Sequence, residues 1–411
     1  MTYPVKWMHS AMTGAPVVEN QWGALIGLLD ACLISGFNVQ TCNSIAVASG
    51  VATATFGSGS HGFQVGQIIQ IDGGGAWNGQ YRVLTVSGSL VTFAAPSGAT
   101  ALATTCTVKT PGLGWTKPFS GTNKAAYKSA DPTSSGCYLR VDNSLDPAYT
   151  TTYAKYAKVT LCESMTDIDT MVGARVPFDP ANPTKNEVAS GSGNTVINGW
   201  FKWYQAKDGR SEVSGDGGSS ARQWLLVGDG KTFYLMINPD TGNNGMAGYS
   251  FGDYERYGVI DPLNCLLMAH ETYSPANIES TYWLGSNNDF AMANSSVGRG
   301  VPLGPASSHL GFKSVFYSAA ALTDYVSGWN CGIIYPNLSD NSLRLSPVHI
   351  VDSQNSLRGQ FRGLYFIPHT NCTVANLSIV ENAGGKFLIA AGTAGQEKPL
   401  SRVAFSLTDW G

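Results

Sequence analysis

The sequence predicts a mainly β protein with an N-terminal helix, a small β-barrel-like module and then a larger β-sandwich-type region. From about residue 45 onward, short runs of alternating apolar and polar residues recur along the chain. Turn-forming residues separate these runs, and glycine alone occupies 48 of the 411 positions. The best helical pattern lies earlier, at residues 19–35, where apolar residues recur at spacings of three and four.

The first 44 residues are predicted to form an arm that carries this helix. Trp22, Leu25 and Leu29 lie on its apolar stripe, and Gly36 follows as a helix stop. Such a stripe indicates either a helix that packs on the neighbouring domain or one that docks on another subunit. The three residues are therefore candidate interface positions.

Residues 45–110 are predicted to form the small β module. Its strands are expected at residues 51–56, 64–71, 81–85, 90–94 and 104–109. Asn78 and Gly79 stand between the second and third of these runs as a hairpin signal. A module of about this size leaves no room for a catalytic cleft.

The remaining residues, 111–411, are predicted to form the larger β-rich region, either as one unit or as two subdomains. Short strands separated by Gly, Asn, Asp and Pro turns are typical of sandwiches and barrels. The clearest are expected at residues 138–141, 158–162, 199–204, 223–227, 232–237, 313–317, 344–351, 364–367 and 386–391. The sequence has no repeat of fixed period, which argues against a solenoid or a propeller.

Charge is scarce and unevenly distributed along the chain. Lys and Arg number 25 and Asp and Glu 28, so the net charge is −3 and only 13% of residues are charged. The first 110 residues contain just Lys6, Glu19, Asp30, Asp72, Arg82 and Lys109. Since an exposed surface needs charge to stay soluble, we predict that this first quarter is covered by other subunits.

Composition also excludes several classes of protein. There is no basic run of the kind that nucleic-acid binding requires, so no nucleic acid is expected as a partner. The longest apolar stretch, residues 22–34, is interrupted by Asp30 and is too short to insert into a membrane. The start of the chain lacks the features of a secretory signal, which predicts synthesis in a cytoplasm. The eight cysteines show no C-x-x-C spacing and are expected to be free thiols.

No motif predicts a catalytic residue, a cofactor or a metal. Residues 57–62 match G-x-G-x-x-G but lack the following helix that a dinucleotide needs, which favours a β loop. Residues 228–232 resemble half a P-loop between two strands, which favours a hairpin turn. Residues 238–245 are rich in oxygen ligands but lack the closing acid of a calcium loop, which favours a long turn. The acids at 163–169 lie on one strand and turn, which does not support paired catalysis.

Aromatic residues provide the other candidate contacts. In the strand that contains Trp200, Trp203 and Tyr204, alternation places Trp200 and Tyr204 on one face and Trp203 on the other. One face is expected in the core, and the other is a candidate subunit contact or sugar-stacking surface. Tyr254 and Tyr257 are further candidates for contact with a receptor.

Two stretches resemble known sequences. Residues 62–66 and 72–83, with G-F-x-x-G before N-G-x-x-x-V, resemble small β modules of tail-associated phage proteins. Residues 357–369 resemble the L-R-G-x-x-x-G-L-Y ending of a family of structural proteins from the tail regions of Mu-like and related phages. This resemblance implies a component of a virion tail or baseplate and transfers no catalytic residue. Arg358, Gly359 and Gly363 are then expected to be structural.

Three hypotheses follow from these observations. The first is a structural protein of a phage tail, located in the virion, which contacts copies of itself and other tail or baseplate proteins and supports attachment to the host. The second is an adhesin of the tail tip that binds a host surface receptor or glycan. The third and least favoured is a polysaccharide-degrading enzyme, because that activity needs two carboxylates facing one sugar.

Overall fold

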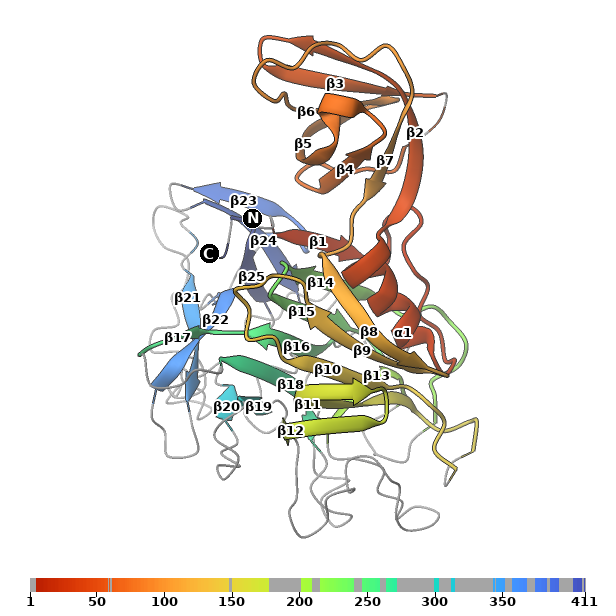
Figure 1. The fold of residues 1–411 in the computed structure, drawn as a ribbon, viewed down its shortest axis with the longest axis vertical. Helices are drawn as coiled ribbons and strands as arrows, with labels where there is room; N and C mark the ends of the chain where they lie inside the picture. Colours follow the sequence, from red (N-terminus) through yellow and green to blue (C-terminus); the bar gives the residue numbers. More distant parts are fainter. Residues whose placement is uncertain are drawn as a thin grey trace.

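The protein is described by a computed structural model that is mainly β, as predicted (Figure 1). The residues that it describes are 5–57, 59, 61–147, 150–176, 201–208, 215–239, 246–258, 264–271, 299–302, 312–314, 343, 345–351, 357–367, 374–382, 385–391, 402–408 and 410. Within them lie a closed barrel and a larger body of packed sheets. No helix among these residues is both long and apolar enough to cross a bilayer.

The N-terminal arm joins the body instead of standing apart from it. Strand β1 (Lys6–His9) pairs antiparallel with β14 (Trp224–Gly228) in the body. Helix α1 (Ala24–Leu29) follows and continues as a π-helical segment, η1 (Asp30–Ser35). The helical stretch is therefore shorter at its start than the predicted 19–35.

Both ends of this helical stretch have local causes. Gly23, with φ of 87°, precedes α1 in a left-handed conformation, and its N–H donates to Asn143 Oδ1 at 2.9 Å. The N–H of Leu25 donates to the same oxygen, so Asn143 satisfies two donors at the helix start. Gly36, with φ of 73°, ends the stretch as predicted.

The barrel is built from six strands that close in the order β2-β3-β6-β5-β4-β7. These are β2 (Phe37–Ala48), β3 (Val51–Phe56), β4 (Ile68–Asp72), β5 (Gly79–Ser87), β6 (Leu90–Ala94) and β7 (Cys106–Thr110). They enclose their own apolar core, in which the Trp77 ring meets Phe93 edge to face. The predicted barrel-like module is thus confirmed, and the inward-facing residues that alternate along its strands fill its interior.

Two details of the barrel differ from the sequence prediction. Strand β2 begins at Phe37, within the segment assigned to the arm, because its polar residues obscure the alternation there. Residues 73–78 connect β4 to β5 and include the 3₁₀ turn η2 (Gly75–Trp77), so the connection is longer than a two-residue Asn-Gly turn. Asn78 contributes differently, through its Oδ1, which accepts the N–H of Gly74 at 2.8 Å.

The body consists of two sheets that pack face to face. The first contains β8 (Trp115–Gly121), β9 (Lys124–Ser129), β10 (Tyr138–Asp142), β11 (Lys155–Asp167), β12 (Thr170–Val176) and β13 (Phe201–Ala206). Trp115 of this sheet packs edge to face on Phe233 of the other, and Trp203 stacks on Tyr249. The predicted sandwich-type arrangement therefore forms one large core.

The second sheet runs from β1 and β14 to the C-terminal strands. It contains β15 (Thr232–Ile237), β16 (Ala247–Asp253), β17 (Glu255–Arg256), β18 (Cys265–Glu271), β19 (Arg299–Pro302), β20 (Phe312–Ser314), β21 (Ser346–Val351), β22 (Leu357–Phe366), β23 (Ile379–Asn382), β24 (Gly385–Ala391) and β25 (Arg402–Ser406). A pairing between β13 and β18 joins the two sheets. Of the predicted strands, positions 199, 200, 315–317 and 344 lie outside the described residues.

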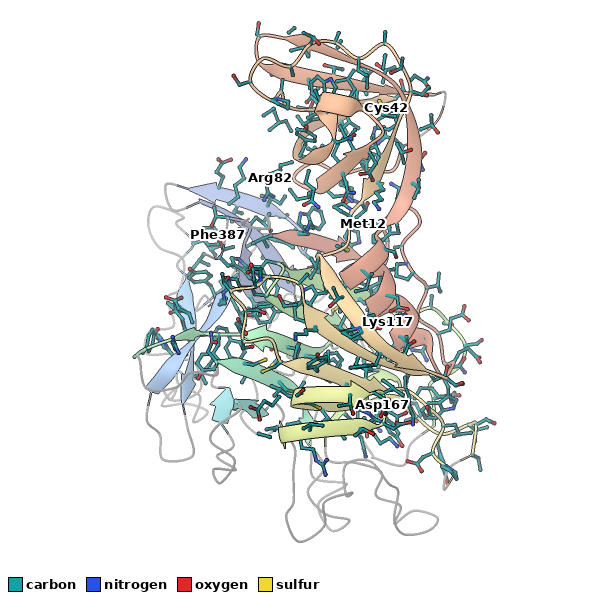
Figure 2. All side chains as sticks on the ribbon, in the orientation of Figure 1. Met12, Cys42, Arg82, Lys117, Asp167 and Phe387 are labelled. Atoms are coloured by element: carbon teal, nitrogen blue, oxygen red, sulfur yellow. The ribbon has the colours of Figure 1, made fainter. Side chains whose placement is uncertain are left out.

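The barrel sits at one end of the molecule, with β7 leading from it into the body (Figure 1). Arg82 lies on the side of the barrel that faces the body (Figure 2). Its guanidinium donates to the carbonyl of Gly66 in the barrel at 2.9 Å and to that of Leu407 in the body at 2.7 Å. Trp7 of β1 donates to the same Gly66 carbonyl at 3.3 Å, so several contacts hold the barrel on the body.

Candidate interaction surface

The outward side of β3 and β6 is the most unusual surface of the barrel. In β3, Ala52, Ala54 and Phe56 point into the core, so Val51, Thr53 and Thr55 point outward. In β6, Val91 and Phe93 are buried, so Leu90, Thr92 and Ala94 point outward. The two sets lie side by side, because Thr53 pairs with Thr92 and Thr55 with Leu90.

Strand β5 extends this surface on the other side of β6. A bulge between Val83 and Thr85 shifts the register, after which Thr85 pairs with Thr92 and Ser87 with Leu90. The hydroxyls of Thr85 and Thr92 lie 2.6 Å apart in a hydrogen bond. We define the barrel face as the outward residues of β3, of β6 and of β5 after its bulge: Val51, Thr53, Thr55, Thr85, Ser87, Leu90, Thr92 and Ala94.

The barrel face carries no charge. Residues 43–71 and 83–108 contain no Asp, Glu, Lys or Arg at all. The charged residues of the barrel lie elsewhere: Asp72 and Lys109 form a 4.0 Å ion pair across β4 and β7, and Arg82 holds the junction with the body. Among its apolar members, Val51 and Leu90 are each 38% exposed, and neighbouring Leu84 is 42% exposed.

A hollow of about 580 Å³ opens beside this face, lined by Gly59, His61, Phe63, Val86, Ser87, Gly88 and Ser89. The predicted G-x-G-x-x-G stretch borders it, and strand β4 follows that stretch instead of a helix. His61 is tied into the wall: its Nδ1 accepts the N–H of Phe63 at 3.0 Å and its ring stacks on that of Phe63. Burial lowers the pKa of His61, which keeps the ring neutral.

The helix residues predicted as interface positions lie within the chain's own fold. Leu25 and Leu29 are fully buried in the body core, and Trp22 is half-buried with its ring edge against Tyr156. Of the two interpretations of the apolar stripe, the structure therefore supports packing on the neighbouring domain. The docking interpretation is corrected for Leu25 and Leu29, because neither side chain reaches the surface.

The aromatic strand is buried on both faces. Trp203 donates its indole N–H to the carbonyl of Met268 at 2.9 Å, and the Tyr204 ring packs edge to face on Tyr156. Trp203 stacks on Tyr249 of the second sheet, and Tyr204 is fully buried on the opposite face. The expectation that one face of this strand is exposed is therefore wrong for Tyr204. Trp200 lies outside the described residues.

The two later tyrosines differ from each other. Tyr254 is buried at the end of β16, which removes it as a contact residue. Tyr257 is 43% exposed, and its hydroxyl donates to Gln360 Oε1 at 2.8 Å and lies 3.1 Å from His349 Nδ1. Of the described candidates in the body strands, Trp203, Tyr204 and Tyr254 are buried, whereas Tyr257 is exposed to a large ligand.

The C-terminal motif lies in β22. A Cβ on Gly359 would stand 2.1 Å from the carbonyl oxygen of Glu255, and one on Gly363 would stand 2.1 Å from the indole nitrogen of Trp410. Both positions thus require the close approach that only glycine allows. Arg358 contributes its backbone to the strand, and its side chain is outside the described residues.

The arginine that matters in this strand is Arg362, which the sequence did not single out. It is buried and pairs with the Asp229 carboxylate at 3.1 Å. Asp229 stands in the turn between β14 and β15, where it also accepts the N–H groups of Lys231 and Thr232 at 2.8 Å. The backbone donors that a phosphate would need are therefore already occupied, and the P-loop-like stretch is a hairpin turn.

The acidic cluster at 163–169 is likewise held by local partners. Asp169 pairs with Lys124 and with Arg140, each at 2.7 Å, and Glu163 accepts the N–H of Ala174 at 2.9 Å. The described part of the chain contains no group of three His, Cys, Asp or Glu side chains that could hold a metal ion. Of the calcium-like stretch 238–245, residues 240–245 lie outside the described residues.

Comparison with known proteins identifies no family. No family model matches the sequence, and no curated protein matches it significantly. Among solved structures, a phage phi92 endosialidase aligns with 90% of this chain at 10% sequence identity and a TM-score of 0.15. The alignment covers 51% of that protein, so the chain spans about half of its length. A TM-score of this size supports no inference about fold or function.

Proposed function

We propose that this chain is a structural component of a bacteriophage tail, in the distal tail or baseplate, and that it assembles with copies of itself through the barrel face. Assembly through the barrel face is supported by one observation, the complete lack of charged residues on that face. The tail location rests on the sequence resemblance of residues 62–83 and 357–369. The working mechanism is assembly, with the body presented outward.

The chemistry of the barrel face suits contact with an identical face. In a symmetric contact the same patch faces itself, with residue i meeting residue j and j meeting i, so a patch with an excess of one sign of charge would repel its copy. An uncharged face avoids this repulsion, and contact with a second copy would bury the exposed side chains of Val51 and Leu90. The hydroxyls of Thr85 and Thr92 already satisfy each other, which lowers the cost of removing them from solvent.

The placement of charge supports the same orientation. Arg82 bonds the Leu407 carbonyl of the body, so this charged side of the barrel is the side that touches its own chain. Strand β3 lies on the far side of the barrel from the body (Figure 1). The barrel face is therefore free to meet other subunits while the body holds the barrel in position.

The test compares two substitutions that add the same charge on exposed strand residues. Leu90→Lys changes the barrel face, where Leu90 is 38% exposed, whereas Val172→Lys changes β12 of the body, where Val172 is 45% exposed. Light scattering after size exclusion should show an oligomer for the wild type and for Val172→Lys, and a monomer for Leu90→Lys. Circular dichroism should be unchanged in both variants.

Two results would contradict the proposal. A wild-type chain that stays monomeric at high concentration would remove the assembly role. An oligomer that survives Leu90→Lys would move the contact away from the barrel face. The tail location is tested separately by cryo-electron microscopy of virions, and particles without this chain would overturn it.

A second candidate is the adhesin, and the observation that favours it is the exposed Tyr257 with its polar neighbours. Tyr257 combines an exposed ring with a hydroxyl that contacts an amide and an imidazole, and tyrosines of this amphipathic kind are enriched at interfaces. Tyr257 and the barrel face belong to different parts of the fold. Tyr257→Ala that abolishes adsorption while leaving the oligomer intact would support this function. That the chain is not an enzyme stays a prediction.

A further inference from the structure

The barrel is joined to the body in two ways. The chain enters and leaves it through adjacent strand ends, because Phe37 at the start of β2 pairs with Thr110 at the end of β7. The loop between β3 and β4 adds contacts that the chain connection does not enforce. In this loop the carbonyl of Gly66 accepts the indole N–H of Trp7, and a Cβ on Gly66 would clash with the side chain of Ile379. Release of the loop would leave the barrel free to turn about the two strand ends.

His9 ends β1 and links the body to this loop. The ring is buried, and its Nδ1 accepts the N–H of Ala11 at 3.2 Å. Because a backbone N–H can only donate, the ring hydrogen is assigned to Nε2, which donates to Gln64 Oε1 at 3.2 Å. The ring also stacks on Trp7, with the ring centroids 5.7 Å apart. The neutral form of His9 therefore satisfies both of its nitrogens across the junction.

His61 repeats this arrangement within the loop itself. It is buried, and its Nδ1 accepts the N–H of Phe63, again two residues further along the chain, at 3.0 Å. Its carbonyl accepts the side-chain amide of Asn38 in β2 at 3.0 Å. A Cβ on the adjacent Gly62 would clash with Thr13 of the arm, so the loop packs closely there too. Both histidines thus lie where the loop meets its surroundings, and both use Nδ1 as an acceptor.

We propose that His9 and His61 form an acid-sensitive latch between the barrel and the body, closed while both rings are neutral and open when they are protonated. A proton on Nδ1 turns that nitrogen into a donor, which then faces another N–H. Each protonation removes one hydrogen bond and places a charge in a buried site, so the charged ring is favoured in solvent. Departure of the His9 ring also releases Gln64. The inference does not depend on the proposed tail function.

The groups around the two rings do not compensate these charges. None of the described residues that line a hollow of about 230 Å³ beside His9 is ionisable: Ser10, Ala11, Gln223, Trp224, Leu225, Met236, Met246, Asn376 and Leu377. His61 packs on the rings of Phe56 and Phe63. Among the described elements at this junction, β1 carries Lys6 and β5 carries Arg82, which are both cations. The acid of β23, Glu381, is paired with Lys386 at 3.1 Å.

The pKa values of the two rings agree in direction with this geometry. Burial lowers the pKa of His9, and the bond to Gln64 only partly opposes it. Burial likewise lowers the pKa of His61. Histidines released from the junction return to the ordinary pKa of 6.5, so below that pH the open state binds protons that the closed state resists. The closed latch is therefore fully stable above about pH 6.5 and loses stability as the pH falls.

Hydrogen–deuterium exchange of the full chain at about pH 7.5 and about pH 5 tests the latch, with each rate divided by the intrinsic rate at that pH. Amides of residues 10–15 and 62–67 should lose protection several-fold at the lower pH, because the junction opens. Amides of residues 232–237, in the core strand β15, should keep theirs. Equal protection of the junction at the two pH values would overturn the proposal.

Asparagine is the matched replacement for both histidines. Its side-chain oxygen accepts the N–H two residues further on, as Nδ1 does here, and it does not titrate. A double variant with His9→Asn and His61→Asn should keep the junction protected at both pH values. His349→Asn, a change in β21 of the body, is the control and should lose protection as the wild type does. Acid opening of the double variant to the wild-type extent would assign the effect to another group and refute the latch.

Nuclear magnetic resonance of the wild type gives a second measurement that needs no variant. The chain has six histidines, whose ring nitrogens can be followed from about pH 8 to about pH 4. At least two rings should titrate below the ordinary pKa of 6.5 and carry their hydrogen on Nε2 at neutral pH. Fewer than two such rings would rule out the latch even if the asparagine variants failed to fold.

Discussion

At the scale of single residues, the largely apolar core of the body contains several buried charged side chains. Arg362 and Asp229 form a buried pair, and Lys6 of β1 is buried close by, opposite Gly228 in the register. Burial raises the pKa of Asp229 and outweighs the opposing effect of Arg362. Removing either Arg362 or Asp229 would leave the other charge in a poorly solvating place, so this pair specifies where β22 meets the turn between β14 and β15.

The buried Lys6 is expected to make the stability of the protein depend on pH. Burial lowers its pKa from 10.5 to about 8, and the charge of Asp229 only partly opposes this. Between about pH 8 and 10.5 the unfolded chain holds a proton that the folded chain has lost, so the free energy of unfolding rises with pH. Lys6→Met keeps the side-chain length and should be more stable than the wild type at pH 7, by a few kcal/mol.

The measurement is urea unfolding of both proteins at pH 7 and at pH 10. The advantage of Lys6→Met should shrink at the higher pH, because the wild-type lysine is then neutral in the folded state. An advantage that stays constant between the two pH values would show that Lys6 remains charged in the fold. A loss of stability at pH 7 would show that its ammonium is well satisfied.

At the scale of elements, the sequence predicts strands well where the pattern is regular. The expected ranges 51–56, 90–94 and 232–237 coincide with β3, β6 and β15. Strand β2 was missed at its start because Asn38 is in a left-handed conformation, φ 53°, and because a register shift occurs between Phe37 and Gln40. Such irregularities break alternation without breaking the strand.

The burial of the aromatic strand could not be predicted from its own residues. Alternation shows which side chains share a face, but whether that face is covered depends on packing partners from strands distant in sequence, such as Tyr249 of β16, on which Trp203 stacks. For the same reason, the sequence shows that charge is scarce in residues 1–110 but does not show which side of the barrel is uncharged. That required the register of β3, β6 and β5.

The junction between helix and barrel depends on one glycine. Gly36 has φ of 73° and ψ of −174°, a region that is essentially restricted to glycine. A Cβ there would also stand 2.1 Å from the carbonyl oxygen of Thr110 at the end of β7. Gly36→Ala should lower the free energy of unfolding by more than about 2 kcal/mol, because strain and clash add.

Gly50, in the turn between β2 and β3, is the matched control. Its φ is 77°, but a Cβ there would have nothing within 4 Å. Gly50→Ala should therefore cost only about 1 kcal/mol, from backbone strain alone. Urea unfolding of the two variants measures the difference, and equal costs would show that the Thr110 carbonyl moves aside freely.

At the scale of the whole molecule, the uneven distribution of charge along the sequence corresponds to different sides of the barrel. The few charges of the barrel lie where it meets its own body or pair across β4 and β7, while the barrel face on β3, β6 and residues 85–87 of β5 has none. Assembly through a neutral face is useful only if the barrel is held in one orientation. The contacts of Arg82 and Trp7 with Gly66, and of Arg82 with Leu407, provide that restraint.

Arg82→Ala tests this restraint, with Lys109→Ala as a control that removes another barrel cation from a loose 4.0 Å ion pair. Loss of the Arg82 bridge leaves the Leu407 carbonyl without its barrel donor, so the barrel should tilt more freely on the body. The distance distribution from small-angle scattering should broaden for Arg82→Ala and stay unchanged for Lys109→Ala. Because neither change touches the barrel face, both variants should keep the oligomer mass of the wild type. If Arg82→Ala reduced that mass, the bridge would also be needed for subunit contact, and orientation and association could not be treated as separate properties of the fold.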